Sequence, residues 1–113
     1  MTTYLPTDAN NNPIPALRLK ATGGAHIIAA TASSARNSTA FDSATQIVSL
    51  YATVPVYVRF GSSSVEAANT DHYFPDSTYY DFAIGGEDTK QFTHVAVLRA
   101  GSEDGSVYIS EKE

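Results

Sequence analysis

Hydrophobic and polar positions alternate along most of this chain with the two-residue period of β-strands. The clearest alternation runs from residue 54 to residue 60, where three valines and Phe60 share one face of the predicted strand. Pro55 lies near the start of this segment and has no amide hydrogen, so we expect the strand to begin at a sheet edge or a bulge. Leu17 and Leu19 alternate with basic residues and predict a half-buried strand of their own.

The same period predicts further strands, which are separated by turn residues at regular spacing. They cover residues 25–31, 46–52, 71–75, 79–84, 92–100 and 106–110. The 25–31 and 92–100 segments are apolar on both faces, which for 92–100 predicts a central strand. We interpret residues 101–105 as a hairpin loop and residues 111–113 as a solvated tail.

Two stretches break the alternation. Residues 31–45 are rich in Ser, Thr and Ala and predict a long loop anchored by Phe41, with a short helix as the alternative because alanine is frequent. Residues 1–13 are polar and rich in asparagine, and predict an extended or disordered arm before a single domain that spans residues 14–113. The predicted fold class is therefore all-β, an antiparallel β-sandwich or small barrel of about eight short strands.

Composition narrows the possible partners. The chain has 113 residues, enough for one compact domain, and 12 acidic against 7 basic residues give a net charge of −5. Without a basic stripe we expect no nucleic-acid partner and no anionic membrane partner. No apolar run approaches the roughly 20 residues of a spanning helix, and the first residues do not resemble a secretory signal. The absence of cysteine excludes disulfides, thiolate nucleophiles and cysteine-bound zinc.

Residues that carry catalysis or bind cofactors form no recognisable set. We expect His26 and His94, which lie inside apolar strands, to have structural or surface roles. Asp71, His72 and Asp76 are a candidate cation site, although the edge of a turn explains them equally well. The chain has no nucleophile elbow and no phosphate loop, and its carboxylates cannot be assigned to one cleft. We therefore predict a non-enzymatic protein with no cofactor and no metal.

Five of the twelve aromatic residues fall between positions 73 and 82. This cluster predicts either a binding platform, because tyrosine is enriched at interfaces, or an apolar plug that closes one end of the sandwich. Tyr79 faces opposite to Tyr80 and Phe82, so Tyr73 and Tyr79 are the pair that we expect at the surface. The candidate protein-interface residues are three in the arm and three in the domain: Tyr4, Leu5, Pro6, Tyr57, Tyr73 and Tyr79.

Four segments resemble a known group of proteins: VPVYVRFG at 54–61, TDHYFP at 70–75, THVAVLRA at 93–100 and DGSVYISE at 104–111. Over residues 46–111 the chain is similar to small virion proteins of tailed bacteriophages and prophages. The resemblance implies a capsid decoration (cement) protein on the outer surface of the major capsid shell, or the base of a head spike. It also implies the major capsid protein or other virion proteins as partners, and assembly as a homo-oligomer, for which trimers are common. Its location would be the capsid exterior, after synthesis in the cytoplasm of the bacterial host.

Three other functions stay open. A neck, tail or baseplate component would use the same segments, with about a dozen copies or fewer in a closed ring. A carbohydrate-binding module is suggested by the aromatic cluster, and a small hydrolase has the least support because neither a nucleophile nor a carboxylate pair is found. For the arm, we expect that deletion of residues 1–13 leaves the domain folded but weakens its association with the particle.

Overall fold

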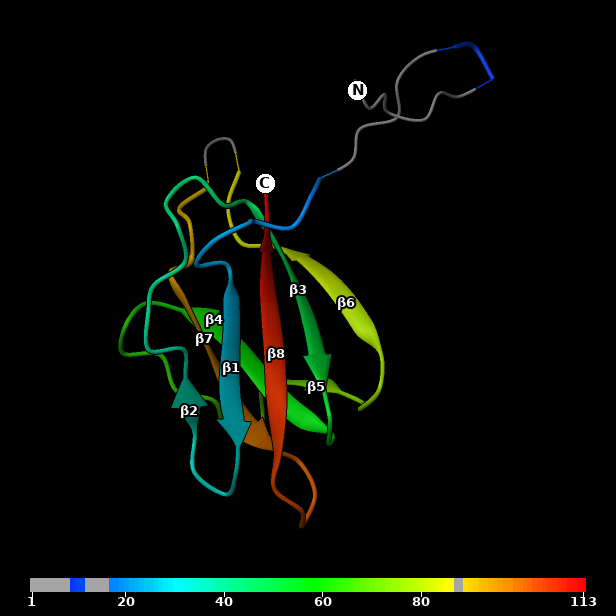
Figure 1. Cartoon of the computed structure of the whole chain (residues 1–113). Helices are drawn as coiled ribbons and strands as arrows, with labels where there is room; N and C mark the ends of the chain where they lie inside the picture. The colour runs from blue at the N-terminus through cyan, green and yellow to red at the C-terminus, as the bar shows by residue number, and fades with distance from the viewer. Residues whose placement is uncertain (1–8, 12–16, 87–88) are drawn as a thin grey trace.

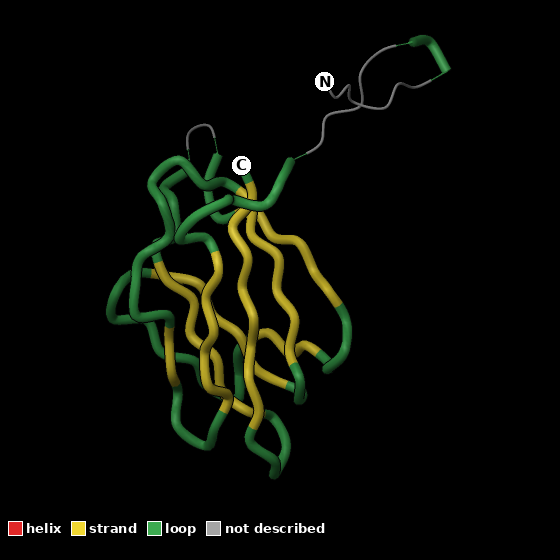
Figure 2. Tube along the Cα trace, viewed as in Figure 1, coloured by secondary structure: helices red, strands yellow, loops and turns green. Residues whose placement is uncertain are grey.

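Eight strands in two antiparallel sheets make up the chain, according to a computed structural model that describes residues 9–11, 17–86 and 89–113. The first sheet contains β1 (Ala25–Ala30), β8 (Gly105–Lys112), β3 (Ile47–Ala52) and β6 (Tyr79–Ala83), in that order. The second contains β2 (Ala35–Arg36), β7 (His94–Arg99), β4 (Val56–Gly61) and β5 (His72–Phe74). Figure 1 shows the first sheet in front of β4, β5 and β7, and Figure 2 shows no helix among the described residues. The predicted all-β class is confirmed, with the two sheets forming a sandwich.

The core lies between the sheets, where alternate side chains of both face inward. Each strand contributes its even-numbered or odd-numbered residues, as the two-residue period requires. The fully buried aliphatic side chains come from both sheets: Val48, Leu50, Val107 and Ile109 from the first, and Val56, Val58, Val95 and Val97 from the second. The strand β7 is buried on both faces, and it lies between β2 and β4, as predicted for residues 92–100.

The long loop before β3 is anchored by Phe41, as predicted. Its side chain is only 3% exposed, and its amide N–H donates to the Thr93 carbonyl at 2.9 Å. The two-residue strand β2 interrupts this loop and pairs with β7. No helix forms here, because Ser and Thr side chains compete for backbone hydrogen bonds that a helix would need.

Residues 101–105 do not form a hairpin loop, contrary to the prediction. The strand β7 pairs with β2 and β4 in the second sheet, whereas β8 pairs with β1 and β3 in the first. The loop therefore crosses from one sheet to the other. Glycines and acidic residues mark a turn, but they carry no information about which sheet the next strand joins.

Two smaller predictions were also wrong. Leu17 and Leu19 are exposed and form no strand beyond a single bridge from Leu19 to Lys112, because β1 already occupies the place beside β8. The strand after Pro55 is central, between β7 and β5, with Pro55 just before its first residue. The 25–31 segment forms a strand as predicted, and although its residues are apolar on both faces, β1 buries only one of them.

Candidate protein-interaction surface

One row of side chains crosses the whole outer face of the first sheet. Ile27 of β1 pairs with Tyr108 of β8, which pairs with Tyr51 of β3, and Tyr51 pairs with Tyr79 of β6. Because paired residues point to the same side of a sheet, all four side chains face away from the core. Ile27 is 69% exposed, Tyr108 44% and Tyr79 73%. We call these four residues the aromatic row.

A shallow hollow of about 460 Å³ lies beside the aromatic row. Its floor contains Ser49 and Ser110, which pair with each other between β3 and β8. On the far side the exposed side chains of Leu17 and Leu19 also line the hollow. The neighbouring charges are compensated, since Lys112 Nζ lies 2.9 Å from Asp81 Oδ1. The surface therefore combines exposed apolar groups with little net charge.

The outer face of the second sheet is covered by its own chain over β7. Val65 and Ala67, from the loop after β4, pack on Ala96 and Leu98 of β7. Arg36 holds this loop in place, because its guanidinium donates to the Val65 carbonyl at 3.3 Å. No loop of the described residues lies over the aromatic row in the same way, and large exposed apolar patches of this kind mark interaction sites.

The candidate interface residues are distributed over both sheets. Tyr57 and Tyr73 form an edge-to-face pair with ring centroids 5.9 Å apart on the outer face of the second sheet. Tyr79 lies on the outer face of the first sheet, against Tyr51 at 4.7 Å. Tyr73 and Tyr79 are both exposed, as expected, but they point in opposite directions and cannot form one platform. The other three candidates, Tyr4, Leu5 and Pro6, lie outside the described residues.

The remaining members of the aromatic cluster face inward. Phe74 lies 5.1 Å from Tyr80 and from Phe82, and Phe60 lies 5.7 Å from Phe82. All four are half-buried and pack against the core. The cluster thus contains both an inner plug, at the end of the sandwich where β5 and β6 lie, and two outward tyrosines.

The sequence prediction missed three members of the aromatic row: Ile27, Tyr51 and Tyr108. A signal for Tyr108 was present, because it alternates with the buried Val107 and Ile109 and must therefore face outward. No such signal exists for Ile27, because its neighbours in the strand are also apolar and the sequence does not indicate which face is exposed. Only the register between strands brings the three together.

A second cluster lies inside the sandwich, around a buried carboxylate. Glu111 is 1% exposed, so residues 111–113 are not simply a solvated tail as predicted. One carboxylate oxygen accepts hydrogen bonds from the Asp42 amide at 2.8 Å and the Thr45 hydroxyl at 2.7 Å. The other lies 2.8 Å from His26 Nε2. Glu111 therefore connects β8 to β1 and to the loop before β3.

Electrostatics keep Glu111 ionised. Burial by itself would raise its pKa, but the hydrogen bonds from Thr45, His26 and the Asp42 amide outweigh burial and hold the pKa below the ordinary value of 4.5. The His26 ring also packs edge-on against Phe41, with centroids 5.2 Å apart. Both partners are thus fixed by packing as well as by hydrogen bonds.

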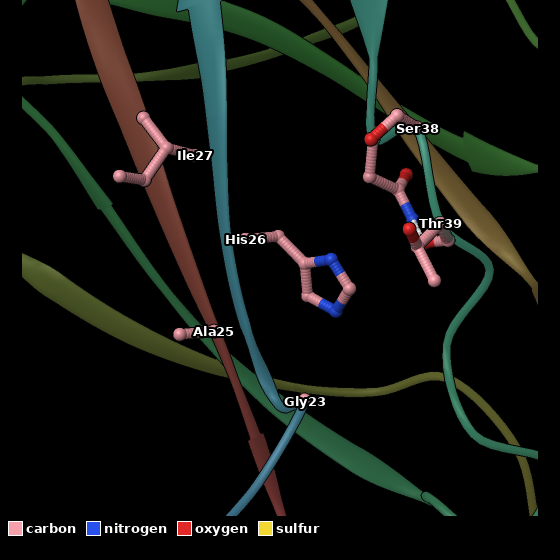
Figure 3. A pocket seen from close by; sticks show the side chains of 7 residues that line it. Gly23, Ala25, His26, Ile27, Ser38 and Thr39 are labelled. Carbon is pink, nitrogen blue, oxygen red and sulfur yellow. Dashed lines mark hydrogen bonds between the residues drawn. The ribbon is translucent and has the colours of Figure 1, made fainter.

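The other side of His26 borders a pocket of about 260 Å³, which Figure 3 shows with the ring directed toward Ser38 and Thr39. A carboxylate that orients an imidazole is also found in hydrolytic triads, where the second ring nitrogen contacts a nucleophile. In the described part of the chain, neither the Ser38 hydroxyl nor the Thr39 hydroxyl is hydrogen-bonded to the His26 ring. We therefore assign the Glu111–His26 pair a structural role.

His94 is buried and has a hydrogen-bond partner next to it in the sequence. Burial lowers the pKa of His94, and the nearby charges of Arg36 and His26 lower it further. His94 Nδ1 lies 2.9 Å from the Thr93 hydroxyl.

At the candidate cation site, the Asp71 carboxylate accepts a hydrogen bond from the Ala68 amide at 2.7 Å, which is a contact within a turn. No three His, Cys, Asp or Glu residues in the described ranges come together as a metal site.

Because comparisons with known proteins found no match, any assignment of function depends on the fold and the surface described above. No family model matches the chain, and neither does a curated protein or a solved structure. In the described part of the chain there is no helix with the length and apolar character needed to cross a membrane.

Proposed function

We propose that this protein is a non-enzymatic structural component of a tailed-bacteriophage virion, and that it decorates the outer surface of the major capsid shell. The resemblance of residues 46–111 to small virion proteins supports the virion assignment. The aromatic row is the observation that carries a binding role. After synthesis in the host cytoplasm, the protein docks on the shell through the outer face of the first sheet.

The chemistry of the aromatic row suits a protein surface. Tyrosine brings a large apolar body and a polar tip at little cost in conformational entropy, and it is enriched at interface hot spots. The row lies on paired strands of a four-stranded sheet, which limits the conformational freedom that its residues lose on binding. Because Lys112 pairs with Asp81, docking through this surface would not bury Asp81 as an unpaired charge.

A carbohydrate partner fits this surface less well. A sugar chain stacks on aromatic rings that lie side by side with their faces open. Tyr51 and Tyr79 instead pack on each other, with centroids 4.7 Å apart and ring planes 41° apart. Tyr73, the other exposed tyrosine of the cluster, lies on the opposite sheet.

The first test is localisation. Purified particles of the phage or prophage that encodes the chain are analysed by quantitative mass spectrometry for its copy number relative to the major capsid protein. Shell-wide decoration requires copies in proportion to the shell subunits. A dozen copies or fewer would instead favour the neck, tail or baseplate alternative, and absence from the particle would refute the virion assignment.

The second test addresses the surface. Particles assembled without the protein are mixed with purified wild type, with the double variant Tyr79→Ser/Tyr108→Ser, or with Tyr73→Ser as the matched control. We expect at least about a tenfold loss of co-sedimentation for the double variant, because hot-spot aromatics contribute about 2 kcal/mol or more each. Equal binding of all three would show that another surface docks. A glycan array that binds wild type but not Tyr79→Ala would favour the carbohydrate alternative.

A further inference from the structure

The strand β6 forms an open edge of the first sheet. Among the strands that the structure describes it pairs with β3 alone, and the Ile84 amide donates to the Gln46 carbonyl at 2.7 Å. In an antiparallel pair the hydrogen-bonded residues alternate, so the backbone groups of Tyr79, Asp81 and Ala83 point away from β3. They have no hydrogen-bond partner among the described residues. This edge is therefore a template for one more strand.

Nothing in β6 itself blocks such pairing. Natural proteins protect edge strands with lysine, proline, bulges or inward-pointing charges. The sequence of β6 is YYDFA, which contains no lysine and no proline. Its one charged residue, Asp81, faces outward and is compensated by Lys112. An unprotected edge in an aromatic strand indicates that a partner strand covers it.

An apolar hollow lies next to this edge, between the ends of the two sheets. Its volume is about 290 Å³, and its lining consists mainly of apolar side chains: Val58, Phe60, His72, Phe74, Phe82 and Ala83. A strand added to β6 would direct every second side chain toward this hollow. The occupant should therefore be a short extended segment with an apolar residue at an inward position.

We propose that residues 2–5 of a second copy of this chain add to the β6 edge. This segment, TTYL, combines β-branched, aromatic and aliphatic residues that favour strands. Residues 1–7 contain no charged side chain, which suits an apolar hollow. With Leu5 inward, Tyr4 faces outward and extends the aromatic row beyond Tyr79. Pro6 has no amide hydrogen and ends the added strand.

The chain before the domain is long enough to reach a neighbour. Sixteen residues precede Leu17, and fully extended they would span about 50 Å. The β6 edge of the same chain is closer. Leu19 pairs with Lys112, Lys112 with Ile47, and Ile47 with Ala83, so three strand spacings, or about 14 Å, separate Leu19 from Ala83. Figure 1, however, shows residues 9–11 clear of both sheets, which favours exchange with a second copy. This contact does not depend on docking to a capsid.

Engineered cysteines test the proposal cleanly, because the chain contains no cysteine. Purified full-length Tyr4→Cys and Tyr79→Cys proteins are mixed in equal amounts and oxidised gently, because the proposed pairing places these two outward residues side by side. Disulfide-linked peptides are identified by mass spectrometry. A disulfide requires the two β-carbons to approach within about 4.5 Å, so random contacts contribute little. Ala29→Cys, on the exposed face of β1, replaces Tyr79→Cys in the control mixture. Circular dichroism confirms that each variant is folded.

We expect the disulfide that joins position 4 of one chain to position 79 of another in at least about tenfold excess over the disulfide that joins positions 4 and 29. Equal yields in the two mixtures, or no link at all, would overturn the proposal. The double variant Tyr4→Cys/Tyr79→Cys distinguishes a link within one chain from a link between two copies. A link within one chain that persists on dilution would show that the segment covers its own edge and would overturn exchange. Because no particle is present, these results are independent of the capsid experiments.

Discussion

Replacing Glu111 tests whether its buried carboxylate holds the sandwich together. In Glu111→Ala, the Asp42 amide, the Thr45 hydroxyl and the His26 ring all lose their shared acceptor. Leaving a buried donor without its acceptor costs about 1–3 kcal/mol, and here up to three donors are affected. That is a large part of the roughly 5–15 kcal/mol typical of a domain of this size. We expect Glu111→Ala to be severely destabilised or unfolded.

Glu111→Gln is the matched control, because it keeps the shape of the side chain. Its amide oxygen can still accept from Asp42 and Thr45, and its NH2 group can donate to His26 if the imidazole changes tautomer. The loss is then the difference between charged and neutral hydrogen bonds, about 1–2 kcal/mol. Urea unfolding at neutral pH, followed by circular dichroism, measures both variants. Stabilities within about 0.5 kcal/mol of wild type for both would refute the reasoning.

The pH dependence supplies an independent readout. The pKa of Glu111 is lower in the folded protein than its ordinary value of 4.5, so its stabilisation is present above that value. It is lost as the pH falls through the folded-state pKa, when the carboxylate takes up a proton. The free-energy gap between wild type and Glu111→Gln should therefore shrink as the pH falls below the ordinary pKa of 4.5 and through the lower folded-state pKa. A gap that stays constant over this range would contradict an ionised, hydrogen-bonded Glu111.

Further predictions concern the packing of the two sheets. Gly105→Ala should cost about 1–3 kcal/mol in urea unfolding, because a β-carbon there would come within 2.6 Å of a side chain in the β3–β4 turn. Gly101→Ala in the same loop is the control and should be neutral, since a β-carbon there has no neighbour within 4 Å. Phe41→Ala should cost about 3–5 kcal/mol, as expected for a buried aromatic anchor, and a loss below about 1 kcal/mol would show that the loop does not need it. Asn37→Ala leaves the Val95 amide without its 2.8 Å acceptor and should cost about 1–3 kcal/mol, with faster hydrogen exchange at that amide.

The strands could be predicted from the sequence because each depends on a local property. The alternation of residues 54–60 and of residues 106–110 sets which side chains face the core, whatever strand lies beside them. The burial of Phe41 was equally accessible, because a single large apolar residue in a polar loop needs a place to pack. These features required no knowledge of which strands pair.

What could not be predicted depends on pairing between distant residues. Glu111 lies near the end of the sequence, and only its partners 85 and 66 residues away make its burial favourable. Ile27 is exposed because nothing in the described chain packs on the outer face of β1, a fact that local apolar character conceals. The aromatic row exists only through the register of four strands.

The position of β8 has a consequence for synthesis. This last strand lies between β1 and β3, so the first sheet cannot close until β8 has left the ribosome. Until β8 pairs with them, β1 and β3 leave their apolar faces exposed to solvent. Pairing across such long sequence separations is slow. We therefore expect nascent chains that stop before residue 105 to be substrates for chaperones and proteases.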